Sequence, residues 1–579
     1  MNNDFSLRVV GDGVVGNDEI VVDQTQIVEK FNEQFLLNGT NLASKFNDNI
    51  NPVSILSDRV QNNFEFTYVN NNDIIEATLE LNDVSGGYDG VPTKIVKKVI
   101  DYIVCPLSHV LNKSLTSGTF PANLKIAKII PIFKDGDKQS TLNYRPVSML
   151  STFSKIFEKI IFKKFNEFVN ENNIICDSQH GFTSGKSTVT ALLHFTEELH
   201  KVFDRKHYAV GLFIDLSKAF KTINHQILLE KLEHYGVRGV SLSFFRSYLK
   251  DRKQFVQLGN IRSNLKQINL GVPQGSILAP LLFLLYINDM PNVFDSMKPV
   301  LFADDSCFYE SGANLNAIID NINKQLVDFS DWIYSNKLTI NYKKSHYVVF
   351  HRNKVLPVNI LNIVLNGKIL DKVNATTFLG LNISFNLNWS NHINLLSSKI
   401  SKINAIIYLT RNNFPKNCLS LLYNSLVYPL LSYCNIVWGR TCKSTLNQLF
   451  VMQKRCIRTI NFRKRREHTN VDFYNLKILK LNDVNTYFSL IFTFKIINNL
   501  VNSTMRWTFA QNERFRNFNN LNLQVPFVGS SQHQTSPYYY CPIIWNNLPN
   551  LIKNSQSLGS FKFNLKNSLI NNYNAESNV

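Results

Sequence analysis

Three aspartates have the type and placement needed to hold divalent metal ions. Asp215 ends the apolar run 207–216 (HYAVGLFIDL), and Asp304 and Asp305 stand together between two further apolar runs. Adjacent carboxylates repel and burial favours their neutral forms, so cations are needed to keep them ionised. Two Mg²⁺ ions, or Mn²⁺ as a substitute, would lower the pKa of an attacking hydroxyl and stabilise an in-line phosphoryl transfer. A lone Asp-Asp pair can also be only a polar turn.

Hydropathy patterns predict the elements that position these aspartates. The short, continuous apolar run 207–216 is typical of a buried strand that delivers an acid from its C-terminal end. The runs on either side of the aspartate pair (KPVLFA and SCFYE) predict a β-hairpin. A turn-rich loop, 267–276, leads into the apolar helix-like run 277–287, and residues 155–169 carry an apolar helix face with lysines opposite.

Composition limits the class of protein and its partners. The 579 residues are 44% hydrophobic, which excludes wholesale disorder and fibrous repeats and is enough for several packed lobes. A net charge of +19 suggests a polyanionic partner such as nucleic acid, although a basic surface can also serve solubility alone.

Cysteine usage and hydropathy indicate where the chain works. The eight cysteines contain no CxxC pair, and a disulfide framework would be sparse for this length, which predicts reduced thiols and an intracellular protein that is not secreted. The longest apolar stretch, 277–287, is too short to span a bilayer, so no membrane partner is expected.

Three ordered motifs resemble those of reverse transcriptases. Residues 211–220 (GLFIDLSKAF), 271–283 (GVPQGSILAPLLF) and 301–305 (LFADD) are similar to the A, B and C motifs of that family. The segments around them resemble non-LTR (LINE-type, jockey-like) retrotransposon polymerases from about residue 73 to the C-terminus. These segments are residues 83–92, 118–138, 143–150 and 179–188 upstream, and 336–345, 377–384, 422–439 and 543–552 downstream.

The resemblance implies an α+β right-hand polymerase with a mainly helical C-terminal extension. The implied parts are an N-terminal extension (1–72), a fingers region (73–205), a palm (206–384), a thumb (385–470) and a C-terminal region (471–579), with the reverse transcriptase domain at about 118–384. The short N-terminal extension predicts a chain that lacks the N-terminal endonuclease domain of many such elements.

The implied activity is RNA-directed DNA polymerisation, in which deoxynucleoside triphosphates extend a DNA primer 3′-OH on an RNA template. By matching positions, Asp215, Asp304 and Asp305 would be the catalytic metal ligands, and Lys344 would protonate the pyrophosphate leaving group. The resemblance also implies a location in the nucleus or in a cytoplasmic ribonucleoprotein, and it does not predict whether the enzyme forms oligomers.

The same matching implies residues that bind the nucleotide. Arg145 and, more weakly, Lys134 would contact the triphosphate, because a guanidinium suits phosphate oxygens. Phe220 would exclude a ribose 2′-OH, or would be only a core residue. Gln274 and Gly275 would pack against the template and the incoming base.

Basic segments predict contacts with the nucleic-acid backbone. KDRK (250–253) and RKRREH (463–468), with Lys464, Arg465 and Arg466, would hold phosphates in a salt-sensitive manner. The aromatic residues Trp438 and Trp545 are expected to pack rather than to stack on bases.

Two departures from the family pattern keep alternative functions open. Lys221 stands where an Asp usually follows the motif A aromatic, and Thr183 replaces a common Arg. One alternative is therefore a degenerate or domesticated RNA-binding protein that retains the polymerase fold without activity. An RNA-templated RNA polymerase is a second alternative, which the PQG loop and the Ala before the aspartate pair disfavour.

Overall fold

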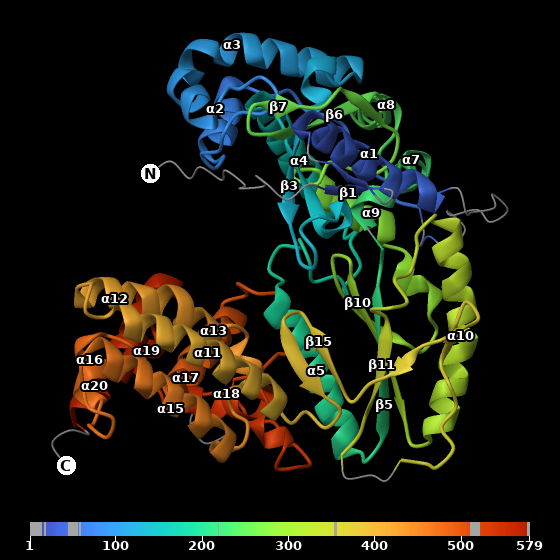
Figure 1. The fold of residues 1–579 in the computed structure, drawn as a ribbon. Helices are drawn as coiled ribbons and strands as arrows, with labels where there is room; N and C mark the ends of the chain where they lie inside the picture. The colour runs from blue at the N-terminus through green and yellow to red at the C-terminus, as the bar shows by residue number, and fades with distance from the viewer. Residues whose placement is uncertain are drawn as a thin grey trace.

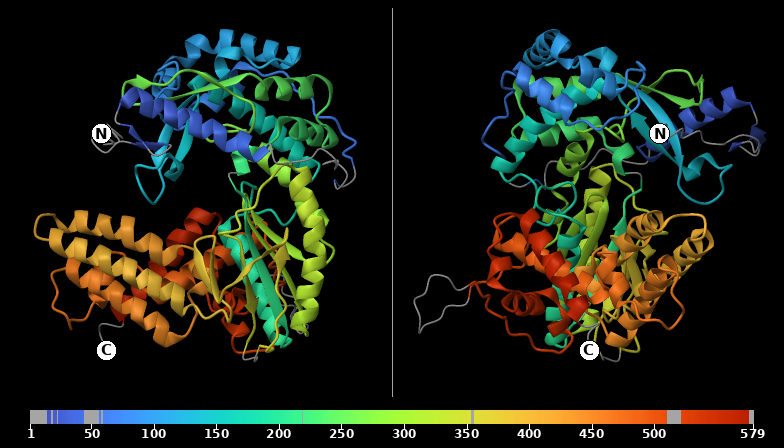
Figure 2. Two further views of the ribbon diagram at one scale, coloured as in Figure 1. Left: turned by 45° about the vertical axis from the view of Figure 1, so that its right-hand side comes forward. Right: turned by 90° about the vertical axis from the view of Figure 1, so that its left-hand side faces the viewer.

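The molecule has a C-shaped outline in which a central sheet joins an upper lobe to a lower helical lobe (Figure 1). The computed structural model describes residues 14–16, 19–21, 23–43, 56, 59–217, 219–352, 356–509 and 521–575. Figure 2 shows that the helices of the lower lobe pack beside the central sheet, while the upper lobe stands beyond the end of that sheet. We call these parts the fingers (upper lobe), the palm (central sheet) and the thumb with the C-terminal helices (lower lobe).

The palm sheet has five strands, and the predicted strand and hairpin are confirmed at its centre. Their order is β14 (Asp371–Lys372), β11 (His346–Phe350), β5 (Tyr208–Asp215), β10 (Asp305–Gly312) and β9 (Lys298–Phe302). Alternate residues of β5 face opposite cores: Leu212 packs with helix α10 (Leu315–Ser335), and Phe213 packs with helix α5 (Thr188–Asp204). Burial on both faces explains the continuous apolar run.

The fingers sheet draws strands from two distant parts of the chain. Its order is β4 (Tyr144–Met149), β3 (Ile126–Phe133), β6 (Arg252–Leu258) and β7 (Ile261–Arg262), with β8 (Lys266–Ile268) also paired to β6. Strands β6 to β8 come from the range that the sequence assigns to the palm, but β6 runs parallel to β3. Parallel strands are joined by long crossover connections, so their pairing cannot be inferred from closeness in the sequence.

Part of the expected N-terminal extension completes the fingers. Helix α1 (Gln24–Ala43) presents apolar side chains at helical spacing, and these pack on Ala127, Ile129 and Val256 of the fingers sheet. The buried residues on α1 are Ile27, Val28, Phe31 and Phe35. The described part of this segment is therefore integrated with the fingers.

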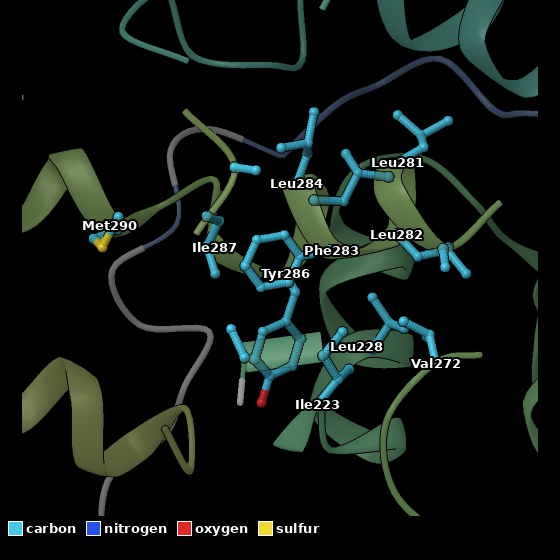
Figure 3. Packing of buried hydrophobic residues seen from close by; sticks show 14 of the residues in the cluster. Ile223, Leu228, Val272, Leu281, Leu282, Phe283, Leu284, Tyr286, Ile287 and Met290 are labelled. Carbon is cyan, nitrogen blue, oxygen red and sulfur yellow. The ribbon is translucent and has the colours of Figure 1, made fainter. Parts of the chain in front are cut away.

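Helices surround the fingers sheet in the upper lobe (Figure 1). The upper lobe contains α2 (Asn71–Leu79), α3 (Thr93–Ser117), α4 (Thr152–Glu171), α7 (His225–His234) and α8 (Gly239–Leu249). Helix α4 confirms the helix predicted over 155–169, with Ile156, Ile160 and Phe165 buried. Helix α9 (Ala279–Ile287) confirms the helix predicted over 277–287 and is buried on almost all sides (Figure 3).

The lower lobe is helical, as the resemblance predicts. The thumb contains α11 (Ser390–Thr410), α12 (Lys416–Leu422), α13 (Tyr428–Ser432), α14 (Asn435–Trp438) and α15 (Lys443–Ile460). The C-terminal helices are α16 (Asn470–Asn475), α17 (Leu481–Ile497), α18 (Pro537–Asn546), α19 (Asn550–Lys553) and α20 (Leu558–Ala575). Trp438 and Trp545 are buried, which confirms that they pack.

Two further predictions concern the chain as a whole. All eight cysteines lie in described segments and none forms a disulfide, as their spacing predicts. Within the described segments, no helix combines the length and apolarity needed to cross a membrane.

Candidate active site

Asp215 and Asp305 lie opposite each other in the palm sheet. The antiparallel register of β5 and β10 pairs Asp305 with Asp215 and Cys307 with Phe213. Directly paired residues have Cα atoms about 4.5–5.5 Å apart and side chains on the same face. Asp304 is the preceding residue, in the tight turn between β9 and β10. The structure therefore brings all three predicted aspartates to one end of the sheet.

Gln179 holds the turn that carries Asp304, a role that the sequence did not reveal. Ala303 has a φ of +53°, in the left-handed region that a residue other than glycine seldom adopts. The buried Gln179 Oε1 accepts hydrogen bonds from the Ala303 N–H (2.9 Å) and the Gly181 N–H (2.8 Å). Gln179 lies in the segment 179–188 that carries the family resemblance, which was its only signal.

Asp215 is anchored by the loop before β11. Its Oδ2 accepts a hydrogen bond from Asn341 Nδ2 (2.9 Å), and its N–H donates to Ser345 Oγ (3.1 Å). Lys344 Nζ lies 3.9 Å from the same Oδ2 and its side chain is 56% exposed. Lys344 is therefore beside the acids, as predicted, whereas Asn341 and Ser345 were not predicted.

The carboxyl groups perturb one another. Desolvation by the surrounding protein, followed by the charges of Asp304 and Asp215, raises the pKa of Asp305 to about 6, and Lys344 opposes the rise. Desolvation and the Asp215 charge also raise the pKa of Asp304, against the influence of Arg145. Such mutual repulsion is relieved when a cation binds between the acids.

Two cations of the fingers face this acidic group. Arg145 lies on β4 and Lys134 directly follows β3, and both side chains are exposed. Desolvation, followed by the charges of Lys344 and Arg145, lowers the pKa of Lys134. Lys134, Arg145 and Lys344 thus act on one another across the site, which makes this region attractive to a polyphosphate.

The motif B loop docks against the fingers sheet. The Ser148 N–H donates to the Gln274 carbonyl oxygen (2.8 Å), and Gly275 has a φ of +128°. A Cβ at Gly275 would lie 2.5 Å from the Ser148 carbonyl oxygen, so only glycine fits. Gln274 and Gly275 remain exposed.

Phe220 and Lys221 lie on the short helix α6 (Ala219–Thr222) that follows Asp215. The partly buried Phe220 ring stacks on Phe283 of α9, with centroids 4.4 Å apart. Lys221 Nζ lies 4.9 Å from the centroid of Phe35 on α1. Lys221 therefore contacts the N-terminal helix.

The predicted phosphate contact at 250–253 is wrong for Arg252. Its side chain is 1% exposed, and its guanidinium stacks 4.8 Å from the Tyr248 ring. Burial raises the pKa of Glu158, and the positive charge of Arg252 beside it opposes this rise. Successive side chains of β6 point to opposite faces of the sheet, so Arg252 points inward while Lys253 remains exposed.

The other basic segment lies far from the acids. Lys464, Arg465 and Arg466 are exposed in the loop between α15 and α16, at the end of the thumb away from the palm (Figure 1). The neighbouring Arg463 pairs with Asp472. The structure therefore does not bring the three residues to the predicted catalytic group.

The donor set suits a hard cation. Among the described residues, no three His, Cys, Asp or Glu side chains are arranged to hold a metal ion by themselves. Mg²⁺ commonly takes only one or two carboxylates and completes its shell with water and substrate phosphates. Asp215, Asp304 and Asp305 offer only oxygen ligands, which fits such a shared site.

Comparison with known proteins identifies the domain around this site. Residues 134–383 match the family model described as "Reverse transcriptase (RNA-dependent DNA polymerase)". This segment is a reverse transcriptase domain. The reverse transcriptase domain contains all the predicted catalytic and nucleotide-binding residues, and reverse transcriptases generally use divalent metal ions.

The chain is also similar in sequence to RNA-directed DNA polymerases of transposons, among them that of the element jockey. "Probable RNA-directed DNA polymerase from transposon BS" of Drosophila melanogaster is 29% identical over 393 residues, which cover 65% of this chain and 42% of the relative. "RNA-directed DNA polymerase from mobile element jockey" of the same species is 28% identical over 410 residues, which cover 69% of this chain and 44% of the relative. The chain spans less than half the length of these relatives.

Proposed function

We propose that this chain is an RNA-directed DNA polymerase of the non-LTR type, which adds deoxynucleotides to a primer 3′-OH on an RNA template. The observation that carries this proposal is the pairing of Asp215 with Asp305, next to Asp304, opposite the fingers cations. Phosphoryl transfer depends mainly on positioning and on electrostatic stabilisation, which this arrangement supplies.

Asp215, Asp304 and Asp305 would hold the metal ions, Mg²⁺ or, as a substitute, Mn²⁺. Bound there, two ions would lower the pKa of the primer hydroxyl and stabilise charge in the in-line transfer. The hydrogen bond from Asn341 orients the Asp215 carboxylate, and the Gln179 contacts fix the backbone before Asp304.

Three cations have separate roles in this proposal. Arg145 and Lys134 bind the triphosphate, whose negative charge offsets the repulsion among the cations that, after desolvation, lowers the pKa of Lys134. Lys344 donates a proton to the pyrophosphate as it leaves, since its exposed ammonium group lies beside Asp215.

Phe220 selects the sugar, and the motif B loop positions the base pair. Stacking on Phe283 limits how far the Phe220 ring can retreat from a ribose 2′-OH. The exposed Gln274 and Gly275 provide a surface for the template and the incoming base. Lys464, Arg465 and Arg466 contribute non-specific attraction for backbone phosphates at the end of the thumb.

Primer extension with purified protein tests the proposal. An RNA template with an annealed DNA primer, the four dNTPs and Mg²⁺ should yield full-length DNA. No product should form when EDTA is added or when the Asp304→Asn variant replaces the parental protein. Extension with rNTPs in preference to dNTPs would support an RNA polymerase instead. Tight template–primer binding without extension in Mg²⁺ or Mn²⁺ would contradict the proposal and favour a degenerate RNA-binding protein.

A further inference from the structure

Two connected hollows lie where the base of the thumb meets the C-terminal helices and the palm. One, of about 910 Å³, is bordered by the start of α15, by α17 and by residues 531–535. The other, of about 480 Å³, reaches His200 of α5 and the loop 386–390. Both are lined by Arg440, Thr441, Cys442 and Thr535, so they form one continuous groove, here called the thumb-base groove.

The thumb-base groove is distinct from the active site. His200 lies near the C-terminal end of α5, which leads directly into the start of β5 at Tyr208. Asp215 lies at the other end of that strand, about 23 Å away for seven steps of about 3.3 Å. The incoming nucleotide and the primer end at the catalytic group therefore do not reach this groove.

The lining of the groove is cationic. Arg352, Arg440 and Lys443 lie along it, and the described lining residues include no Asp or Glu. The acids behind the wall, Glu197 and Asp204, both hydrogen-bond to His533. A cluster of cations in a concave surface attracts a polyanion.

Backbone donors add to this attraction at the start of α15. The helix has 18 residues, and its N-cap residue, Cys442, makes no side-chain capping hydrogen bond. The Ser444 hydroxyl, followed by the Ser444 and Thr445 N–H groups, lowers the pKa of the Cys442 thiol. The same end of the helix can therefore stabilise negative charge in the groove.

His200 forms part of the wall of the groove. Its side chain is 8% exposed, and its Nδ1 has no hydrogen-bond partner among the described residues. Burial, followed by the His533 charge, lowers the pKa of His200 to about 3, so its ring is neutral. Because that nitrogen is itself shielded from solvent, His200 supplies a neutral part of the wall and no hydrogen bond to a bound molecule.

The polar side chains of the groove favour RNA over DNA. Amide groups occur along both hollows, where they can donate to and accept from a ribose 2′-OH. They belong to Asn386, Asn388, Asn447, Asn482, Gln532 and Gln534. Each hollow has the size of a small-molecule site, which suits one or a few unpaired nucleotides rather than a duplex.

We propose that the thumb-base groove binds a single-stranded RNA segment separate from the template strand in the active site. Arg440 and Lys443 contact its phosphates, and the amides contact its 2′-hydroxyl groups. This site goes beyond the proposed polymerase function, because its occupancy can be measured whether or not the chain extends a primer.

A binding assay at constant ionic strength, with the template–primer site already filled, tests this proposal. The protein is first saturated with an unlabelled template–primer duplex, and a fluorescent, unstructured 12-nucleotide RNA or its DNA counterpart is then titrated by anisotropy. We expect the parental protein to bind the RNA at least tenfold more tightly than the DNA. The variant Arg440→Glu/Lys443→Glu should lose at least 30-fold in RNA affinity, while its affinity for the template–primer changes less than threefold.

Matched variants separate the groove from general charge. Lys562→Glu/Lys566→Glu makes the same change in charge on exposed residues of α20 and should alter RNA affinity less than threefold. Arg440 stacks on Tyr540, so a second variant, Asn388→Ala/Asn447→Ala, avoids that contact and should reduce the preference for RNA over DNA. Equal losses in both charge variants, or equal binding of RNA and DNA by the parental protein, would overturn the proposal.

Discussion

His533 joins the C-terminal region to the palm, and its removal should release that region locally. Its Nε2 lies 2.7 Å from Glu197 Oε1 and its Nδ1 lies 2.5 Å from Asp204 Oδ2, both on α5. The three side chains are 5%, 7% and 16% exposed, respectively. The change His533→Leu would leave two largely buried carboxylates without this partner.

The size of the effect follows from this burial. Removing one partner of a buried ion pair costs about 3–5 kcal/mol, and the partial exposure of Asp204 argues for the lower end. A loss of about 3 kcal/mol corresponds to roughly a hundredfold increase in local opening. Hydrogen exchange followed by mass spectrometry should therefore show amides of residues 531–546 exchanging about a hundredfold faster in the variant at pH 6.

The effect should depend on pH in a defined direction. Burial disfavours the charged ring, but Glu197 and Asp204 outweigh it and raise the pKa of His533 above its ordinary 6.5. The stabilisation is therefore complete below pH 6.5 and is lost as the pH rises through the raised pKa. Also facing the cluster are His200, which stacks on His533 and stays neutral, and Arg352, which acts on His200.

A second histidine of the lower lobe provides a control for the His533→Leu variant. His468 is an exposed histidine of the same lobe, and His468→Leu should leave exchange in 531–546 unchanged. The difference in amide exchange rate between the parental protein and the His533→Leu variant should become smaller as the pH rises from 6 to about 9. Exchange within threefold of the parental rate at pH 6, or a difference that grows with pH, would refute the ion-pair account.

Three further predictions concern the sugar, the core and the charged surface. Phe220→Ala should increase incorporation of rNTPs relative to dNTPs by tens- to hundreds-fold in a competition assay, and an unchanged ratio would mean that Phe220 only packs. Lys231→Met leaves Asp289 buried without its partner at 2.6 Å and should lower the free energy of unfolding by denaturant by about 3–5 kcal/mol. The double variant Lys231→Met/Asp289→Leu should recover most of this lost stability, and a single variant as stable as the parental protein would contradict the pairing. Charge reversal of Lys464, Arg465 and Arg466 should flatten the negative slope of log affinity for RNA against log salt, and an identical slope would remove them from the interface.

Local patterns were enough to predict the elements that carry the acids. An apolar run buried on both faces predicted β5 with Asp215 at its end, and two runs around Asp304 and Asp305 predicted the hairpin. Helical spacing predicted α4. These features depend on neighbouring residues in the chain, so the sequence contains their signal.

Contacts between distant segments could not be predicted in the same way. Asn341 binds Asp215 across 126 positions and Gln179 supports Ala303 across 124, and neither polar residue has a local pattern that distinguishes it. Arg252 looked like a surface cation, but the pairing of β6 with β3 turns it into the core.

The single-turnover rate of adding one dNTP to a primer on an RNA template tests the proposed active site most directly. Asp215→Asn removes a carboxylate from the proposed metal site, whereas Asp320→Asn changes an exposed acid of α10 whose partner is Lys324. Losing stabilisation of about 4 kcal/mol or more should slow addition by Asp215→Asn at least a thousandfold with unchanged template–primer affinity. The control should keep the parental rate. An Asp215→Asn rate within tenfold of the parental rate would contradict the assignment of the active site.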